Sequence, residues 1–290
     1  MRPLRLRAPA KINLCLHVTG RRADGYHELV TLMCPLALYD TLTLTPAAAG
    51  IDVICSHPDV PEDPSNLAVR AARLFFEANT AKTASPMTGL TIRIDKKIPV
   101  GAGLGGGSSN AAAVLTGLNR LWGHPFSDAE LLEMGGRIGA DVPFFIKGVP
   151  ALATGIGDRL EAFDRLSPWT ALLVYPDAAV STAWVYKNLN LRLTKDEKKL
   201  RKFHFEDRFF NAAEHLVNDL EVVTVKAFPV ISEIKRLLLA HGAAGAMMSG
   251  SGSSVFGLFE TPERANSAYS ALCNNQQSQN WTLYVADLLI

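Results

Sequence analysis

The sequence contains no apolar run of the roughly 18 residues that a membrane-spanning helix needs. Its basic start, MRPLRLRAPAKINL, is interrupted by polar residues and lacks the continuous apolar stretch of a signal peptide. Cysteine is scarce: the four cysteines lie far apart, with no Cys-x-x-Cys pair and no histidine cluster at zinc spacing. Because reduced thiols explain this pattern, we expect a cytoplasmic protein without disulfide bonds or a structural metal.

Net charge is also nearly absent. Lysine and arginine total 29, aspartate and glutamate total 28, and the formal net charge is +1. This balance excludes an overall field that would draw the protein to nucleic acid or to an anionic membrane. The charged stretch 195–208 (KDEKKLRKFHFEDR) mixes both signs and is more typical of a solvated surface. We therefore expect a small-molecule substrate, no nucleic-acid or membrane partner, and a monomer or homodimer.

The pattern of apolar residues indicates an α+β protein. Strand-like alternation occurs within the first sixty residues, at 89–95 (GLTIRID) and at 171–176, whereas residues 65–78 and the segments after 106, 127 and 141 are helix-like. The second half alternates helices with short strands, and GAMMSGSGSSVFGLF predicts strand, loop and strand. A change of texture near residues 150–170 suggests two domains, residues 1–165 and 166–290.

The most informative segment is glycine-rich, GAGLGGGSSN at residues 101–110, and it opens an alanine-rich helix. Without a Cβ, successive backbone N–H groups can converge on a phosphate. The helix N-terminus adds further N–H groups and the positive end of its dipole. Ser108 and Ser109 can donate hydrogen bonds or orient a magnesium ion. This chemistry predicts a phosphate-binding loop, and a turn that only lets the helix pack closely remains the alternative.

Two better-known phosphate motifs do not fit this loop. Gly101, Gly103 and Gly106 match the G-x-G-x-x-G dinucleotide fingerprint. However, the preceding strand carries charged residues, and no strand ending in an acid follows about twenty residues later. The Walker motif needs a lysine before its Ser or Thr, and no lysine occurs between Gly101 and Asn119.

Three further segments carry candidate chemistry. Lys11 and Asn13 are two apart on a probable strand and so leave it on one face, although such a lysine often snorkels to water. Asp141 fits either a helix N-cap or a general base, which needs a carboxylate close to a hydroxyl nucleophile. The segment Ser249–Ser254 (SGSGSS) is either a turn between strands or part of a binding site.

Taken together, these motifs resemble the GHMP kinases. PAKINL, PVGAGLGGGSSNAA, GADVPFF and SGSGSSVFGLF occur in the order typical of that family, from Ala8 to about Phe259. The resemblance implies a two-domain α+β architecture with the active site in the cleft between domains. It also implies phosphoryl transfer from ATP with Mg²⁺. We assign no side chain as a dedicated metal ligand.

The resemblance also assigns roles to individual residues. Asp141 would take the proton from the substrate hydroxyl, Lys11 would stabilise the transition state, and Asn13 would hold the acceptor end of the substrate. The residues expected at the nucleotide are Asn66, Lys97, Gly101, Gly103, Gly105, Gly106, Gly107, Ser108, Ser109 and Asn110. Of these, Asn66, Lys97 and Asn110 match polar positions near the nucleotide in the family.

The segment Gly20–Leu29 (GRRADGYHEL) narrows the resemblance to the branch that phosphorylates a cytidine diphosphate alcohol on the non-mevalonate route to isoprenoids. Ala23 stands where a proline is expected in that branch. Tyr26 and His27 would meet the cytosine, one by stacking and one by hydrogen bonds to its edge. A member acting on another alcohol, such as mevalonate or homoserine, is the nearest alternative.

A second aromatic residue is expected after a Ser-Thr pair in the second half. Thr182 belongs to this pair, and Tyr186 follows it, so we expect both to bind the substrate. A non-catalytic member that only senses nucleotide would lack the base or the cation. Both Lys11 and Asp141 are present, which favours an enzyme.

Overall fold

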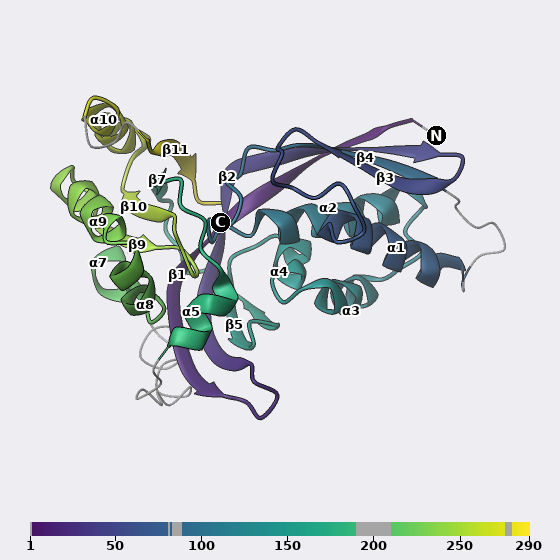
Figure 1. Cartoon of the computed structure of the whole chain (residues 1–290), viewed down its shortest axis with the longest axis horizontal. Coiled ribbons are helices and arrows are strands. Elements are labelled where there is room, and N and C mark those ends of the chain that lie inside the picture. The colour runs from purple at the N-terminus through teal and green to yellow at the C-terminus, as the bar shows by residue number, and fades with distance from the viewer. Residues whose placement is uncertain (1, 81, 83–88, 190–209, 276–279) are drawn as a thin grey trace. The chain divides into compact units, whose positions relative to one another are not determined.

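The computed structural model describes residues 2–80, 82, 89–189, 210–275 and 280–290 (Figure 1). The charged stretch 195–208 lies outside these residues. The chain forms two compact units: the first comprises residues 1–10, 38–100 and 105–148, and the second comprises residues 11–37, 101–104 and 149–290. Each unit is thus assembled from separate stretches of chain. The division at residue 165 and the cleft between domains stay predictions.

The sheet of the first unit has the order β3 (Gly50–Cys55), β4 (Gly89–Asp95), β2 (His27–Ala47) and β1 (Leu4–Arg21). Strand β4 is parallel to β3 and antiparallel to β2. As its alternation predicts, Leu90, Ile92 and Ile94 are buried on one face. Strands β1 and β2 are long enough to contribute residues to both units.

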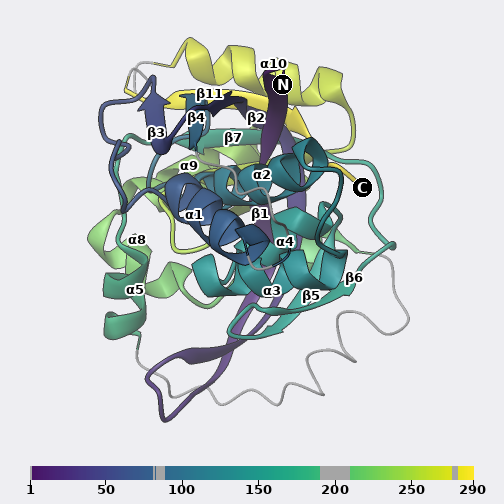
Figure 2. The same ribbon diagram turned by 90° about the vertical axis from the view of Figure 1, so that its right-hand side faces the viewer.

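Helices supply the other layer of the first unit: α1 (Leu67–Thr80), α2 (Gly106–Leu121), α3 (Asp128–Ile138) and α4 (Val142–Lys147). Helix α1 packs on α2, while α3 and α4 pack on each other and on α2 (Figure 2). Helix α1 begins two residues later than the predicted start at residue 65. The reason is that Asn66, one residue before the helix, accepts a hydrogen bond from the Ala68 N–H and so occupies the capping position.

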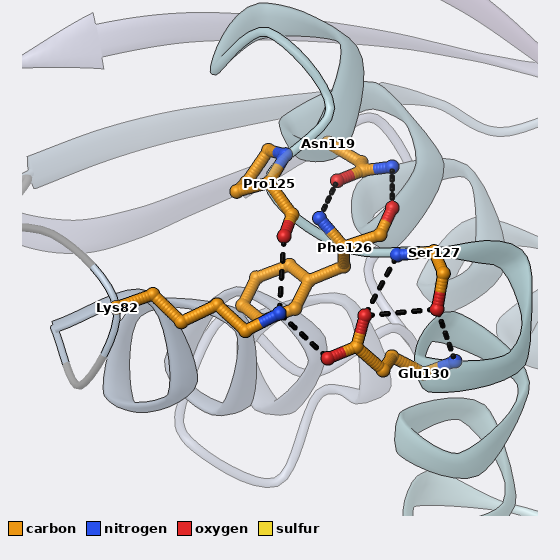
Figure 3. Close-up of polar contacts among 6 residues, drawn as sticks. All are labelled: Lys82, Asn119, Pro125, Phe126, Ser127 and Glu130. Carbon is orange, nitrogen blue, oxygen red and sulfur yellow. Dashed lines mark hydrogen bonds and ion pairs between the residues drawn. The ribbon is translucent and has the colours of Figure 1, made fainter.

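Polar side chains close the connection between α2 and α3 (Figure 3). Asn119 donates from Nδ2 to the Phe126 carbonyl over 2.9 Å and accepts at Oδ1 from the Phe126 N–H over 3.0 Å. Ser127 and Glu130 form a capping box at the start of α3. The helix start predicted near Ser127 is thus confirmed. Lys82 pairs with Glu130, Nζ to Oε1, over 2.6 Å.

This cluster makes the stability of the protein sensitive to acid. The hydrogen bond from Lys82, followed by those from the Ser127 N–H and hydroxyl, lowers the pKa of Glu130 to about 2. The folded-state pKa is therefore below the unfolded value of about 4.3. The stabilisation is present above about pH 4.3 and is lost as the pH falls toward 2.

We expect Glu130→Gln to flatten this dependence, so that the variant loses less melting temperature than the wild type between about pH 5 and pH 3. Thermal unfolding at a series of pH values measures the difference. Glu133→Gln, at an exposed glutamate on the same helix, is the control and should follow the wild type. Parallel curves for wild type and Glu130→Gln would contradict the assignment.

The second unit contains an antiparallel sheet in the order β11 (Thr282–Asp287), β7 (Thr170–Tyr175), β10 (Val255–Phe259) and β9 (Gly245–Met248). Helices α9 (Val230–Ala240) and α10 (Pro262–Cys273) pack against this sheet (Figure 1). The strand predicted at 171–176 and the strand–loop–strand prediction are confirmed. Separate sheets and helices of this kind confirm the α+β class.

Two of the remaining strands of the second unit pair with the inner parts of β1 and β2, the parts within residues 11–37 that belong to this unit. Strand β5 (Ala151–Gly155) pairs with β2 and with β6 (Arg159–Ala162), and β8 (Val217–Asn218) runs parallel to β1 beside Cys15 and Leu16. The short helices are α5 (Thr182–Asn188), α7 (Ala212–His215) and α8 (Glu221–Ala227). None of the helices in the described part of the chain is both long and apolar enough to cross a membrane.

Candidate active site

Lys11 and Asn13 form a buried polar pair on β1. Lys11 is only 5% exposed, so the snorkelling alternative is wrong. Its Nζ donates to Asn13 Oδ1 over 2.6 Å, and Asn13 Nδ2 donates to Thr31 Oγ1 over 2.8 Å. A buried ammonium is costly unless hydrogen bonds compensate it. Asn13 therefore both accepts from the lysine and fixes its direction, because Thr31 holds the asparagine in turn.

The first part of the glycine-rich segment, residues 101–104, belongs to the same unit as Lys11. The Lys11 N–H donates to the Leu104 carbonyl over 3.0 Å. Gly103 has a φ of +77°, and a Cβ on it would lie 2.1 Å from the Ser249 carbonyl oxygen. Such an approach is possible only for glycine. The glycine-rich segment is therefore in direct backbone contact with the Ser249–Ser254 loop.

That loop connects β9 and β10, as one of its two interpretations predicted, but it also makes contacts beyond a simple turn. Ser249 Oγ donates to the Gly103 carbonyl over 3.0 Å, and the Ser254 N–H donates to the Ala102 carbonyl. A Cβ on Gly250 would lie 3.1 Å from Gly103 O and 3.5 Å from Asn13 Oδ1. Three motifs that are far apart in the sequence thus meet within the second unit.

The rest of the glycine-rich segment starts α2 in the first unit. Gly105 precedes the helix with a φ of 71° and makes no side-chain cap. Ser109 Oγ and Asn110 Oδ1 are buried, and neither finds a hydrogen-bond partner among the described residues. Buried polar atoms without partners are costly, so a bound group with hydrogen-bonding atoms would satisfy them. These atoms and the free backbone N–H groups of the helix start fit a phosphate.

Lys96, which the sequence did not single out, lies beside this helix start. A Cβ on Gly106 would come 2.8 Å from Lys96 Nζ. The same ammonium is paired with the buried Asp40 over 2.7 Å and donates to the Ile98 carbonyl over 2.6 Å. Lys97, the predicted residue, is exposed. The sequence signal for this pair was Asp40, which ends the apolar run VTLMCPLALYD and, if buried, needs a cation as its partner.

Asn66 is already engaged in local structure. Besides accepting from Ala68, it donates from Nδ2 to the Pro61 carbonyl over 2.7 Å. These two hydrogen bonds belong to the start of α1, so the structure of this helix start accounts for the burial of Asn66. Its predicted contact with the nucleotide, like those of Lys97 and Asn110, stays a prediction.

Asp141 occupies the N-cap position of α4, and Pro143 lies in the first turn. The backbone of Asp141 is already helical, with φ −83° and ψ −12°, and its side chain makes no capping hydrogen bond. Capping of the helix therefore does not account for this aspartate, and the general-base prediction is left standing.

The residues expected at the cytosine lie in the second unit. Tyr26, which follows a tight turn at Gly25, is 60% exposed. The rings of His27 and Tyr186 stack with centroids 4.9 Å apart and planes at 21°. Burial, and then the charge of Arg21, lowers the pKa of His27, so its ring is neutral near pH 7. A neutral imidazole carries one donor and one acceptor.

Thr182 joins the aromatic residues to the Ser249–Ser254 loop. Its Oγ1 is 2.8 Å from Ser251 Oγ, and either hydroxyl can donate. The first turn of α5 is capped by Ser181, which accepts from the Trp184 N–H. In the predicted Ser-Thr pair, Ser181 therefore caps the helix and Thr182 contacts the loop. No group of three or more His, Cys, Asp or Glu suited to a metal ion occurs in the part of the chain that the structure describes.

The chain is similar to known proteins over most of its length. The model of the GHMP kinases N terminal domain matches residues 66–149, and that of the GHMP kinases C terminal matches residues 200–277. A 4-diphosphocytidyl-2-C-methyl-D-erythritol kinase of Syntrophotalea carbinolica is 51% identical over 90% of this chain and 91% of its own. The enzyme of the same name from Geobacter metallireducens is 45% identical over the whole of both chains.

Solved structures give the same result. The chain is similar to a crystal structure of 4-(cytidine 5'-diphospho)-2C-methyl-D-erythritol kinase, with a TM-score of 0.79 and 36% identity over 98% of this chain and 99% of that one. A homoserine kinase from Cytophaga hutchinsonii has a TM-score of 0.74 at 18% identity, over 100% of this chain and 95% of that one. The second likeness concerns the fold alone.

Proposed function

The chain belongs to the GHMP kinase family and is a small-molecule kinase, and from this membership we propose that it phosphorylates the 2-hydroxyl of 4-diphosphocytidyl-2-C-methyl-D-erythritol. ATP is the phosphate donor, and the reaction is a step of the non-mevalonate route to isoprenoid precursors. One observation carries the substrate assignment. Relatives of that name are 51% and 45% identical over 90% and 100% of this chain.

The transfer needs a base, a source of positive charge and a phosphate cradle. In our proposal the Asp141 carboxylate accepts the proton of the 2-hydroxyl, whose oxygen then forms a bond to the γ-phosphorus of ATP. The bond from that phosphorus to the β,γ-bridging oxygen breaks, and ADP leaves. Lys11, held by its 2.6 Å hydrogen bond to Asn13, compensates the charge on the transferring group.

The glycine-rich segment would bind the phosphates of ATP through its N–H groups, with Ser108 and Ser109 donating from their hydroxyls. The unpartnered, buried Ser109 Oγ supports this role. Mg²⁺ bound with the nucleotide would supply further charge compensation on the phosphates. Asn66, Lys97 and Asn110 are our candidates for contacts to the rest of the nucleotide, and Lys96 is a further cation beside the helix start.

Cytosine would be recognised by the aromatic residues of the second unit, with Tyr26 stacking on the base. A neutral His27 can donate to N3 or O2 of cytosine, or accept from its N4 amino group. Tyr186 would supply the opposite face, and Thr182 would contact the substrate beside the Ser249–Ser254 loop. Asn13 would hold the acceptor end. We place the reaction in the cytoplasm, in a monomer or homodimer without nucleic-acid or membrane partners.

Tyr26→Ala should weaken binding of the cytidine substrate by about 1–3 kcal/mol because stacking on one face of the base is lost. The KM for ATP should not change. Since the ring is largely exposed, the melting temperature should also stay near that of the wild type. Tyr26→Phe keeps the ring and is the matched control. A substrate KM that is the same in all three proteins would refute the stacking role.

The proposed reaction is tested by ADP release with ATP and Mg²⁺ and a panel of acceptors: the cytidine compound, mevalonate, homoserine and none. Turnover with the cytidine compound alone is the expected result. Turnover with another alcohol would retain the kinase chemistry but overturn the roles of Tyr26, His27 and Tyr186. If the folded protein released no ADP with any acceptor, the result would favour a non-catalytic family member that acts as a sensor.

A further inference from the structure

The connection from β8 into α8, which the proposed reaction does not use, binds the backbone next to the site. Asn218 is 9% exposed and lies where β8 pairs with β1 at Leu16. Its Nδ2 donates to two carbonyls, that of Met248 over 2.9 Å and that of Gly250 over 2.8 Å. Its Oδ1 accepts from the Leu220 N–H over 3.0 Å. The whole amide is thus committed to backbone groups, one at the end of β9 and one, that of Gly250, in the Ser249–Ser254 loop.

Two more side chains of the same connection continue this binding. Glu221 Oε2 accepts from the Met248 N–H over 3.1 Å, and its carboxylate is paired with Lys235. Thr224 Oγ1 donates to the Ser251 carbonyl over 3.1 Å. The backbone from Met248 to Ser251 is therefore held by three side chains from one short segment. Glycines and serines have small side chains that pack little, so these hydrogen bonds help to fix the course of the loop backbone.

The backbone held in this way lies next to the buried pair Lys11 and Asn13 on β1. Gly250 is the residue whose Cβ position lies 3.5 Å from Asn13 Oδ1 and 3.1 Å from Gly103 O. Asn13 Oδ1 is the acceptor of the Lys11 ammonium. Asn218 is thus hydrogen-bonded to the Gly250 backbone, which passes beside Asn13 Oδ1, and that oxygen accepts from Lys11. A shift of the Gly250 backbone would displace the oxygen that directs the lysine.

We propose that Asn218 is a positioning residue for phosphoryl transfer: it sets the Gly250 backbone against Asn13 and Gly103 and thereby fixes the direction of Lys11. This role rests on the proposed function. Asparagine suits the position because one amide provides two donors to neighbouring carbonyls and one acceptor for the following N–H. Thr224 acts in the same way on the next carbonyl of the loop.

Asn218→Asp tests the role because the variant has the same shape but turns the donor into an oxygen that repels the two carbonyls. Asn119→Asp is the matched control. Asn119 is also buried, at 4% exposed, and its side-chain amide is hydrogen-bonded to the Phe126 backbone in the first unit (Figure 3). Both full-length variants should melt below the wild type. Steady-state kinetics is then measured well below all melting temperatures.

Only Asn218→Asp should lower kcat, by about 10²-fold, since small displacements of catalytic groups have effects of this size. The KM for the cytidine substrate should stay within about threefold, because the lost interaction acts in the transition state. Equal kcat in Asn218→Asp and Asn119→Asp would make Asn218 a structural residue and overturn the proposal.

Thr224→Val nearly keeps the volume of the side chain and replaces the hydroxyl, which is 3.1 Å from the Ser251 carbonyl and 3.4 Å from the Leu220 carbonyl of its own helix, by a methyl group. This variant decides the matter if Asn218→Asp does not fold. We expect a fall in kcat of about tenfold with an unchanged substrate KM. The positioning role would be refuted if Thr224→Val had the kcat of the wild type and Asn218→Asp, where it folds, had the kcat of Asn119→Asp. The proposed function would not be affected by this result. A wild type without turnover on the cytidine compound would instead contradict the proposed function, and the kcat comparison would then use the alcohol that it does phosphorylate.

Discussion

Asp141→Asn lowers kcat by about 10²–10⁴-fold and leaves nucleotide binding nearly intact, if Asp141 is the general base. Asparagine has the same shape as aspartate but cannot accept the proton of the substrate hydroxyl. Because the Asp141 side chain makes no capping hydrogen bond to α4, the substitution should not weaken the helix. ADP release gives kcat, and calorimetric titration with ADP gives the affinity for nucleotide.

Asp128→Asn is the control for this experiment. Asp128 is an exposed aspartate in the first turn of α3, so its substitution removes the same charge near another helix start of the first unit. Its kcat should equal that of the wild type. Near-normal turnover in Asp141→Asn would mean that Asp141 acts only through local structure, and the base would have to be sought elsewhere.

Gly105→Val abolishes measurable ATP binding if the glycine-rich segment is the phosphate cradle. Gly105 has a φ of 71°, in the left-handed region where a β-branched residue is strained. Valine would also place a side chain at the start of α2, where the backbone N–H groups need to approach the phosphates. Both effects act on the segment that our proposal assigns to the phosphates of ATP. Titration with ATP measures the loss of affinity.

Backbone strain alone could mimic this result, and Gly123→Val separates the two causes. Gly123 lies just beyond the other end of α2 with a φ of 72° and has no atom within 4 Å of its Cβ position. Both variants should lose comparable thermal stability, on the order of 1–2 kcal/mol. Gly123→Val should keep the ATP affinity of the wild type. Preserved affinity in Gly105→Val would make the loop structural.

Local pattern was sufficient where a residue's environment is set by its own element. The alternation of Leu90, Ile92 and Ile94 predicted their common buried face because side chains of a strand point alternately to its two sides. The glycine-rich segment predicted a helix start at the right place. The resemblance to the GHMP kinases, carried by short motifs and their order, gave the family that the comparisons confirmed.

Local pattern failed where the partner is distant. Gly103 and Ser249 are 146 positions apart, and Asn218 and Gly250 are 32 apart, so no spacing rule connects them. Lys96 and Lys97 are neighbours on a strand end and differ only in which side they face. The buried Asp40 indicated that a cation lies near it, but which of the two lysines it pairs with is decided by packing.

The two long strands have a consequence for dissecting the protein. Strands β1 and β2 each change unit along their length, since residues 1–10 and 38–100 belong to the first unit and residues 11–37 to the second. If the chain is cut between α4 and β5, the N-terminal fragment keeps all of β1 and β2. It loses β8, which pairs with β1, and β5, which pairs with β2. Such a fragment would present unpaired strand edges, which promote aggregation. No single cut of the polypeptide therefore places the start of α2 and the Lys11–Asn13 pair in two intact parts.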